Sequence, residues 1–143
     1  MVWSLFAGVA FAEPQQLEAV VRTLSMRDPV SCERVEALTP TPVETLLEVV
    51  QTVKMPPWAP MQAADCLLKG HAVEVRAQLD GWVTDPALKG LGRLVLVHLD
   101  TLPLEVAVPV ARKALAEGAD PALAKDRILA ATRPEVRAVA TTP

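Results

Sequence analysis

Two cysteines are the first candidates for chemistry in this chain. Cys32 and Cys66 are its only cysteines. An even number of cysteines in an exported protein usually indicates a disulfide. Closing a loop of about 34 residues stabilises a fold by roughly 3 to 4 kcal/mol in the chain-entropy model. The alternative is two small, buried apolar side chains. The sequence predicts a Cys32–Cys66 disulfide if the chain is exported.

The histidines and hydroxyl residues form no catalytic or metal-binding pattern. His71 and His98 have no thiolate or carboxylate at metal-ligand spacing, so no zinc site is predicted. No serine, cysteine or threonine lies in a nucleophile motif. Gly90 and Gly92 in "KGLGR" fall inside a helical pattern without a preceding strand, so they form no phosphate-binding loop. We therefore expect no enzyme, no catalytic residue, no metal and no cofactor, with His71 capping a turn and His98 at the edge of the core.

Aromatic and methionine side chains suggest a surface that binds a partner. Trp58 and Trp82 are expected beside the turns within two consecutive helix pairs, and Met55 and Met61 flank Trp58 in "KMPPWAPM". Large aromatic side chains are typical of binding hot spots. These residues predict a rim that grips an apolar peptide or ligand. The alternative is that the two indoles close the ends of the hydrophobic core.

A second candidate surface is basic. Lys89 and Arg93 are one helical turn apart, on the helix face opposite the apolar residues. Lys125, Arg127 and Arg133 lie on or after the equivalent helix of the next unit. These cations predict a modest basic patch for an acidic partner, although neighbouring aspartates dilute it. The alternative is an ordinary solvated helix face.

The elements that must position these residues are short helices that begin at prolines. Four segments, "TPVETLLEVV", "HAVEVRAQLD", "LPLEVAVPVA" and "RPEVRAVATT", place a glutamate shortly after their start. The glutamates are Glu44, Glu74, Glu105 and Glu135, which recur at steps of about 30 residues. A second series interleaves with the first and starts at Asp28, Pro56, Asp85 and Asp120. Each unit is therefore predicted to be helix, turn, helix.

Such a period predicts an all-α solenoid in which stacked neighbours bury one another's apolar stripes. Four helix pairs are expected at about 15–38, 41–70, 72–101 and 103–132. A fragment from Pro134 is too short for a pair and is expected to cap the last apolar face.

The openings of these segments resemble those of a known repeat family. "DPALKGLGRLVLVHL" and "RPEVRAVA" resemble the Asp-Pro-x-Val-Arg-x-x-Ala openings of HEAT repeats, and the short period is similar to the bacterial HEAT-like type also found in phycobilisome lyases. The resemblance covers about residues 15 to 140 and implies a short right-handed α-solenoid with the second helices on its concave surface. Pro56–Pro57 departs from the pattern, and the pattern's arginine is absent from the second helices of units one, two and four. The matching positions pack and cap helices, so they indicate fold and not function.

This arrangement bears on the disulfide. Cys32 and Cys66 fall on the second helices of adjacent units, which a solenoid places side by side. However, Cys32 lies three residues after Pro29 and Cys66 nine after Pro57, which offsets them by about 9 Å along the helices. A disulfide needs Cα atoms within about 7 Å. A bridge therefore requires a short or tilted first pair.

The first twelve residues have the features of a signal peptide. Val2 to Ala12 is uncharged and apolar, and Ala10-Phe11-Ala12 has the small-x-small pattern of a cleavage site before Glu13. The run is too short to span a bilayer. The alternative is a buried first helix. The sequence thus predicts a signal peptide at 1–12, a HEAT-like domain at 13–143, a periplasmic or secreted location, and no stable membrane insertion after cleavage.

Composition limits the function. The chain is 51% hydrophobic and 22% charged with a formal net charge of −3, which argues against nucleic-acid binding. The predicted function is a non-catalytic scaffold that binds another protein or peptide. The competing hypotheses are an accessory or lyase-like protein that holds a small ligand on the same fold, and a structural module of a larger envelope assembly.

Overall fold

The computed structural model describes residues 13–28 and 30–141, so the predicted signal peptide at 1–12 lies outside the described residues. Within those ranges every regular element is helical, which confirms the predicted all-α class. The elements are α1 (Pro14–Leu24), α2 (Cys32–Glu36), α3 (Pro42–Thr52), α4 (Trp58–Gly70), α5 (Arg76–Thr84), the 3₁₀ turn η1 (Pro86–Leu88), α6 (Lys89–Val97), α7 (Leu104–Glu117), α8 (Pro121–Leu129) and α9 (Pro134–Thr141).

Prolines and capping side chains set the helix starts. Helices α1, α3, α8 and α9 each begin with a proline. At the first position of a helix a backbone N–H has no acceptor within the helix, so proline, which lacks the N–H, loses no hydrogen bond there. Asp120 accepts a hydrogen bond from the Leu123 N–H at the start of α8, and Asp85 accepts one from the Ala87 N–H at η1. Helix α2 differs from expectation. It begins at Cys32, with Ser31 as its cap, and not at the predicted Asp28.

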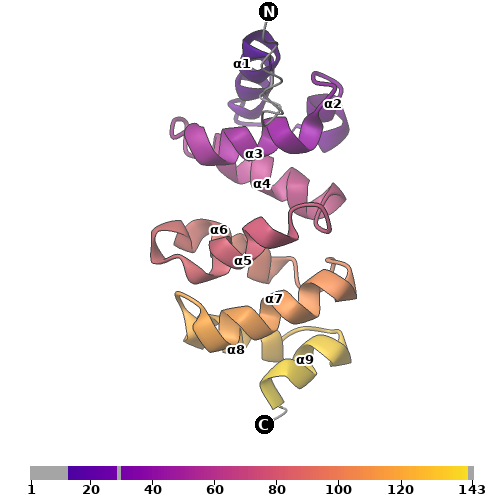
Figure 1. Cartoon of the computed structure of the whole chain (residues 1–143), viewed down its shortest axis with the longest axis vertical. Coiled ribbons are helices and arrows are strands. Elements are labelled where there is room, and N and C mark those ends of the chain that lie inside the picture. Colours follow the sequence, from indigo (N-terminus) through magenta and orange to yellow (C-terminus); the bar gives the residue numbers. More distant parts are fainter. Residues whose placement is uncertain (1–12, 29, 142–143) are drawn as a thin grey trace, which may run out of the picture.

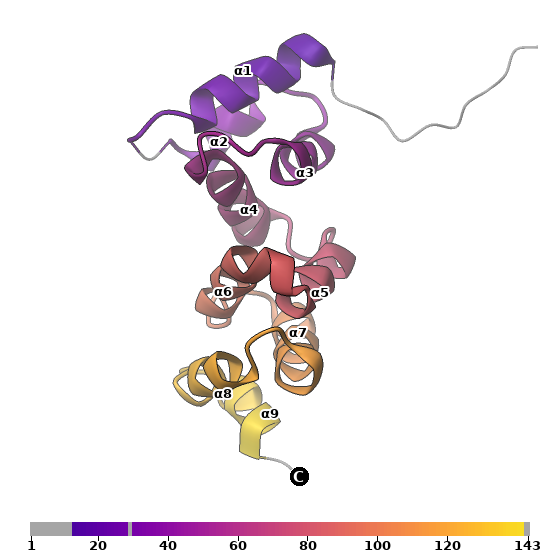
Figure 2. The same ribbon diagram turned by 90° about the vertical axis from the view of Figure 1, so that its left-hand side faces the viewer.

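The helix pairs follow one another along the long axis of the molecule in chain order, with α1 and α9 at opposite ends (Figure 1). Within each pair the two helices contact each other: α1 with α2, α3 with α4, α5 with α6, and α7 with α8. Neighbouring pairs meet through α1–α4, α4–α6, α5–α7, α6–α8 and α7–α9. Figure 2 shows α3, α5 and α7 on one side and α2, α6 and α8 on the other.

One hydrophobic core runs through all of these pairs. It extends from Val20 in α1 to Val136 in α9 without leaving a pair out. Several of its members are alanines, such as Ala63, Ala107 and Ala111, each with 0% exposure. These small side chains let neighbouring helices approach closely.

Polar contacts also tie successive pairs together at a nearly constant sequence separation. Most of them join a side chain to a group in the preceding pair. The joined residues are Ser25 and Trp58, Glu36 and His71, Asp65 and His98, Asp100 and Thr132, and Leu99 and Arg133, which lie 33, 35, 33, 32 and 34 residues apart. The separations are close to the spacing of the glutamates in the sequence.

The two cysteines lie at disulfide distance, as predicted. Their Cα atoms are 5.4 Å apart. Cys32 is the first residue of α2 and Cys66 lies within α4. The expected offset does not prevent the bridge because α2 has only five residues and need not run alongside α4.

Candidate functional site

Trp58, one of the residues of the predicted rim, is exposed and has apolar neighbours. Its indole is 39% exposed and Met55 is 76% exposed, whereas Met61 is half-buried. The Trp58 Nε1–H donates a hydrogen bond to the Ser25 carbonyl oxygen at 3.0 Å, in the turn between α1 and α2. Met26, the residue after Ser25, is 45% exposed. Met26, Met55 and Trp58 form an apolar rim, in which the indole also holds two helix pairs together.

Trp82 does not belong to this surface. It is only 5% exposed, in the last turn of α5, and it is part of the core. Helix α6 passes close over it, because a Cβ atom on Gly92 would lie 2.7 Å from the Trp82 carbonyl oxygen. The expectation that Trp82 binds a partner is therefore replaced by the alternative, that its indole closes the core. Gly92 in "KGLGR" therefore allows α5 and α6 to approach closely.

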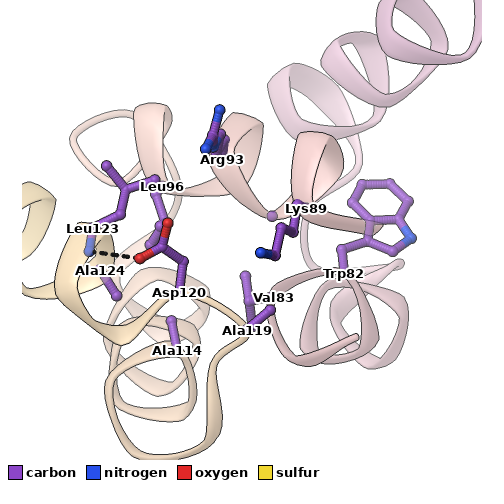
Figure 3. A pocket seen from close by; sticks show the side chains of 11 residues that line it. Trp82, Val83, Lys89, Arg93, Leu96, Ala114, Ala119, Asp120, Leu123 and Ala124 are labelled. Atoms are coloured by element: carbon purple, nitrogen blue, oxygen red, sulfur yellow. Dashed lines mark hydrogen bonds between the residues drawn. The ribbon is translucent and has the colours of Figure 1, made fainter. Parts of the chain in front are cut away.

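Lys89 and Arg93 lie at a small cavity between the third and fourth pairs (Figure 3). Trp82, Val83 and Leu96 line the same cavity, together with residues of the fourth pair. Its volume is about 20 Å³. That is room for roughly one water molecule. The cavity is too small for an organic ligand, so any function of the two cations must lie on the surface.

Neither cation is neutralised within the described residues. Lys89 and Arg93 are exposed and take part in none of the ion pairs found there. Asp120 lines the same cavity, but its carboxylate caps α8 through the Leu123 N–H at 3.1 Å. Lys125 and Arg127 on α8 are likewise exposed and without an ion pair in residues 13–28 and 30–141. The exposed Asp126 offsets part of this charge on α8, so α6 and α8 together carry a modest excess of positive charge.

Both histidines face carboxylates from the preceding pair, which no sequence motif indicates. His98 Nε2 lies 2.8 Å from Asp65 Oδ1, and its Nδ1 lies 3.3 Å from the Thr101 hydroxyl. His71 contacts Glu36 through Nε2, and its Nδ1 lies 3.4 Å from Glu74 Oε1. A search for acids about one predicted period before each histidine would have found both partners. These contacts join each histidine to an acidic side chain of another helix.

The environment of His71 changes its titration. Burial lowers the pKa of His71, but hydrogen bonds and charges from Glu36 and Glu74 outweigh burial, so the pKa is raised above its usual value of 6.5. The positively charged imidazolium is thereby favoured between two carboxylates. This is the behaviour of a structural ion pair.

A groove of about 540 Å³ lies between α2 and α4. Its lining includes both cysteines, Glu33, Asp65 and Lys69. Asp65 is already engaged by His98 and by Lys69, whose Nζ lies 2.8 Å from Asp65 Oδ2. The groove is large enough for a small ligand, but its charged groups are mostly paired with one another.

No group of three or more metal-ligating side chains that would suit a metal ion occurs in the described part of the chain. None of the helices within residues 13–28 and 30–141 has the length and hydropathy needed to cross a bilayer. No family model, curated protein or solved structure matches this chain.

Proposed function

We propose that this protein is a non-catalytic scaffold that binds another protein, built as a short HEAT-like α-solenoid and located in the periplasm or outside the cell. The observation that carries the proposal is the surface of the second helices and their turns. It exposes large apolar side chains, such as Trp58 and Val97, and the unpaired cations Lys89 and Arg93. Exposed apolar and cationic groups of this kind are typical of protein-binding surfaces.

The spacing of contacts supports the solenoid part of the proposal. Polar contacts between neighbouring pairs recur at 32 to 35 residues, and contacts extend from each pair to its neighbours along the chain. Repeats that contact only their neighbours define a solenoid. An array of this kind offers a long surface with no deep active site.

The cysteine pair supports the location. A disulfide persists in oxidising compartments and is rare where thiols are kept reduced. Cys32 and Cys66 lie at disulfide distance, and the apolar run at Val2 to Ala12 has the composition of an export signal. Both features favour a periplasmic or secreted protein.

The groove between α2 and α4 favours a second candidate function, that of an accessory protein holding a small ligand. Its volume of about 540 Å³ falls within the range of small-molecule sites. We rank it second because the charged residues that line the groove are largely paired with one another.

The proposal is tested by affinity capture from a periplasmic extract and culture supernatant of the source organism. The immobilised protein is compared with Trp58→Ala and Lys89→Ala variants whose folding is checked by circular dichroism. We expect one protein to be retained in stoichiometric amount by the wild type and to be reduced by a variant. Retention of no protein, or of the same set by all three, would contradict the scaffold. Recovery of a small molecule that survives purification would favour the second candidate.

A further inference from the structure

Helices α6 and α8 have the same length and the same register in consecutive pairs. Each has nine residues. Their first residues, Lys89 and Pro121, are about 32 residues apart, which is the length of one helix-pair unit. The two helices contact each other. From this common register we infer that the fifth positions of the two helices form one row on the surface and the ninth positions a second.

The first row is cationic and the second is apolar. Arg93 and Lys125 occupy the fifth positions, and both are exposed. Val97 and Leu129 occupy the ninth positions and are 55% and 42% exposed. Residues four apart lie on the same side of a helix, so the two rows are adjacent and about 6 Å apart along the helices.

The side chains that α6 and α8 bury in the core lie at other positions than these two rows. Leu96 and Ile128 occupy the eighth positions, are 6% and 0% exposed, and belong to the core. Val97 and Leu129 lie outside that core. Two exposed apolar side chains at matching positions offer apolar surface that a partner would cover.

Charge indicates what the partner carries. Arg93 and Lys125 have no ion pair within the described residues. Lys89 adds positive charge one turn before Arg93, while the exposed Asp126 beside Lys125 offsets part of the charge on α8. The formal net charge of the chain is −3. This face is therefore a local exception that attracts an acidic group by charge complementarity.

The apolar row favours a peptide over a nucleic acid. A phosphate backbone is recognised by cations and presents no apolar side chains to Val97 and Leu129. In an extended peptide, successive side chains point to opposite sides. A strand running between the two rows would direct acidic side chains to the cations and the intervening apolar side chains to the valine and leucine.

We propose that α6 and α8 form a docking surface for an extended segment of a partner protein in which acidic and apolar residues alternate, held by Arg93 and Lys125 on one side and by Val97 and Leu129 on the other. This inference rests on the proposed scaffold function, since it specifies the class of partner. The surface spans two helix pairs, so neither helix alone supplies it.

The test is a fluorescence anisotropy titration with a short dye-labelled peptide in which glutamate and leucine alternate. We expect the double variant Arg93→Glu/Lys125→Glu to weaken binding by about tenfold or more, since it reverses both charges that face the peptide. The matched control is Arg76→Glu/Arg112→Glu, which makes the same change in net charge with exposed arginines of α5 and α7. The control should stay within about twofold of the wild type.

The apolar row is tested with a double variant and a matched control of its own. Val97→Ser/Leu129→Ser should weaken binding by roughly tenfold, whereas Val73→Ser/Leu104→Ser, at positions 46% and 37% exposed elsewhere on the surface, should not. All variants are checked for an unchanged thermal transition.

Three outcomes would overturn the inference: no binding of the peptide, equal loss in the test and control variants, or tighter binding of a single-stranded oligonucleotide than of the peptide. Failure of the docking-surface inference can be distinguished from failure of the proposed scaffold function. If a captured partner is retained by Arg93→Glu/Lys125→Glu, the scaffold function stands and this docking surface is wrong.

Discussion

At the scale of single residues, two side-chain ties hold the short helix α2 against the rest of the chain. Cys32, its first residue, is bridged to Cys66 of α4. Glu36, its last residue, pairs with His71 in the turn after α4. A five-residue helix has little stability of its own. The position of α2 therefore depends on these two contacts and on Val35, which lies between Cys32 and Glu36 in the sequence and is fully buried.

Removing the disulfide should destabilise the protein. We expect Cys32→Ser/Cys66→Ser to lower the free energy of unfolding by about 3 to 4 kcal/mol, because the unfolded chain regains the entropy of an open loop of about 34 residues. Urea denaturation followed by circular dichroism measures the change. A reductant should lower the stability of the wild type and leave the double variant unchanged. Equal stability of oxidised and reduced wild type would contradict the bridge.

The ion pair of His71 should make stability depend on pH. Its pKa is raised in the folded protein, so its contribution is fully present below the unfolded value of about 6.5 and is lost as pH rises through the folded pKa. We expect His71→Gln to cost more stability at pH 6 than at pH 8, measured by urea denaturation at both pH values. Glu36→Gln, which removes the charged partner, should show the same trend. A cost independent of pH for both variants would be inconsistent with this pair.

At the scale of helices, close packing of α5 against α6 depends on one glycine. A Cβ atom on Gly92 would meet backbone, the Trp82 carbonyl oxygen at 2.7 Å and the Val83 Cα at 3.4 Å. Backbone atoms yield less easily than a flexible side chain, so the helices would have to separate. At the other glycines of the two helices, Gly81 and Gly90, an added Cβ would meet nothing closer than 3.9 Å.

Alanine substitutions in these helices should therefore have opposite effects. Gly92→Ala should lower the free energy of unfolding by about 1 to 3 kcal/mol through overpacking. Gly81→Ala, where nothing lies within 4 Å, should raise it by about 0.5 to 1 kcal/mol because alanine favours the helix. Gly90→Ala is the control on α6, since its Cβ would meet only the Met61 Sδ at 3.9 Å. Thermal melts measure all three, and a Gly92→Ala protein as stable as Gly90→Ala would refute the close approach.

The sequence predicts most of these helices, because the signals that start them are local. A proline or an Asp-Pro dipeptide sets the first turn at Pro42, Asp85 and Asp120, and the structure has a helix or a 3₁₀ turn beginning there. Helix α2 starts later than predicted because Ser31 caps it in place of Asp28. The sequence does not determine whether Trp82 is buried, since the side on which α6 covers α5 is a property of packing and not of the segment itself.

At the scale of the whole molecule, the predictable part is the spacing of the helix pairs. Glutamates spaced about 30 residues apart indicate a repeated unit, and contacts such as Asp65 with His98 join groups 33 residues apart. The two partners lie on different helix pairs and neither has a distinctive motif, so the sequence points to these contacts only through a search for acids about one period before each histidine. The proposed docking surface is predictable only in part. Lys89 and Arg93 already predict a basic patch in the sequence. Val97 and Leu129 are recognised as an apolar row only when α6 and α8 are placed side by side.

Both proposed binding functions depend on an open, linear stack of helix pairs, in which α1 and α9 lie at opposite ends of the molecule (Figure 1). The most direct test is the distance between spin labels at exposed positions of these two helices, introduced as Gln15→Cys and Glu135→Cys and measured by pulsed electron paramagnetic resonance. Four steps of about 8 to 10 Å between stacked helices predict a narrow distribution at about 35 Å or more. A distribution centred at about 20 Å or below, as a closed helix bundle would give, would contradict the linear stack.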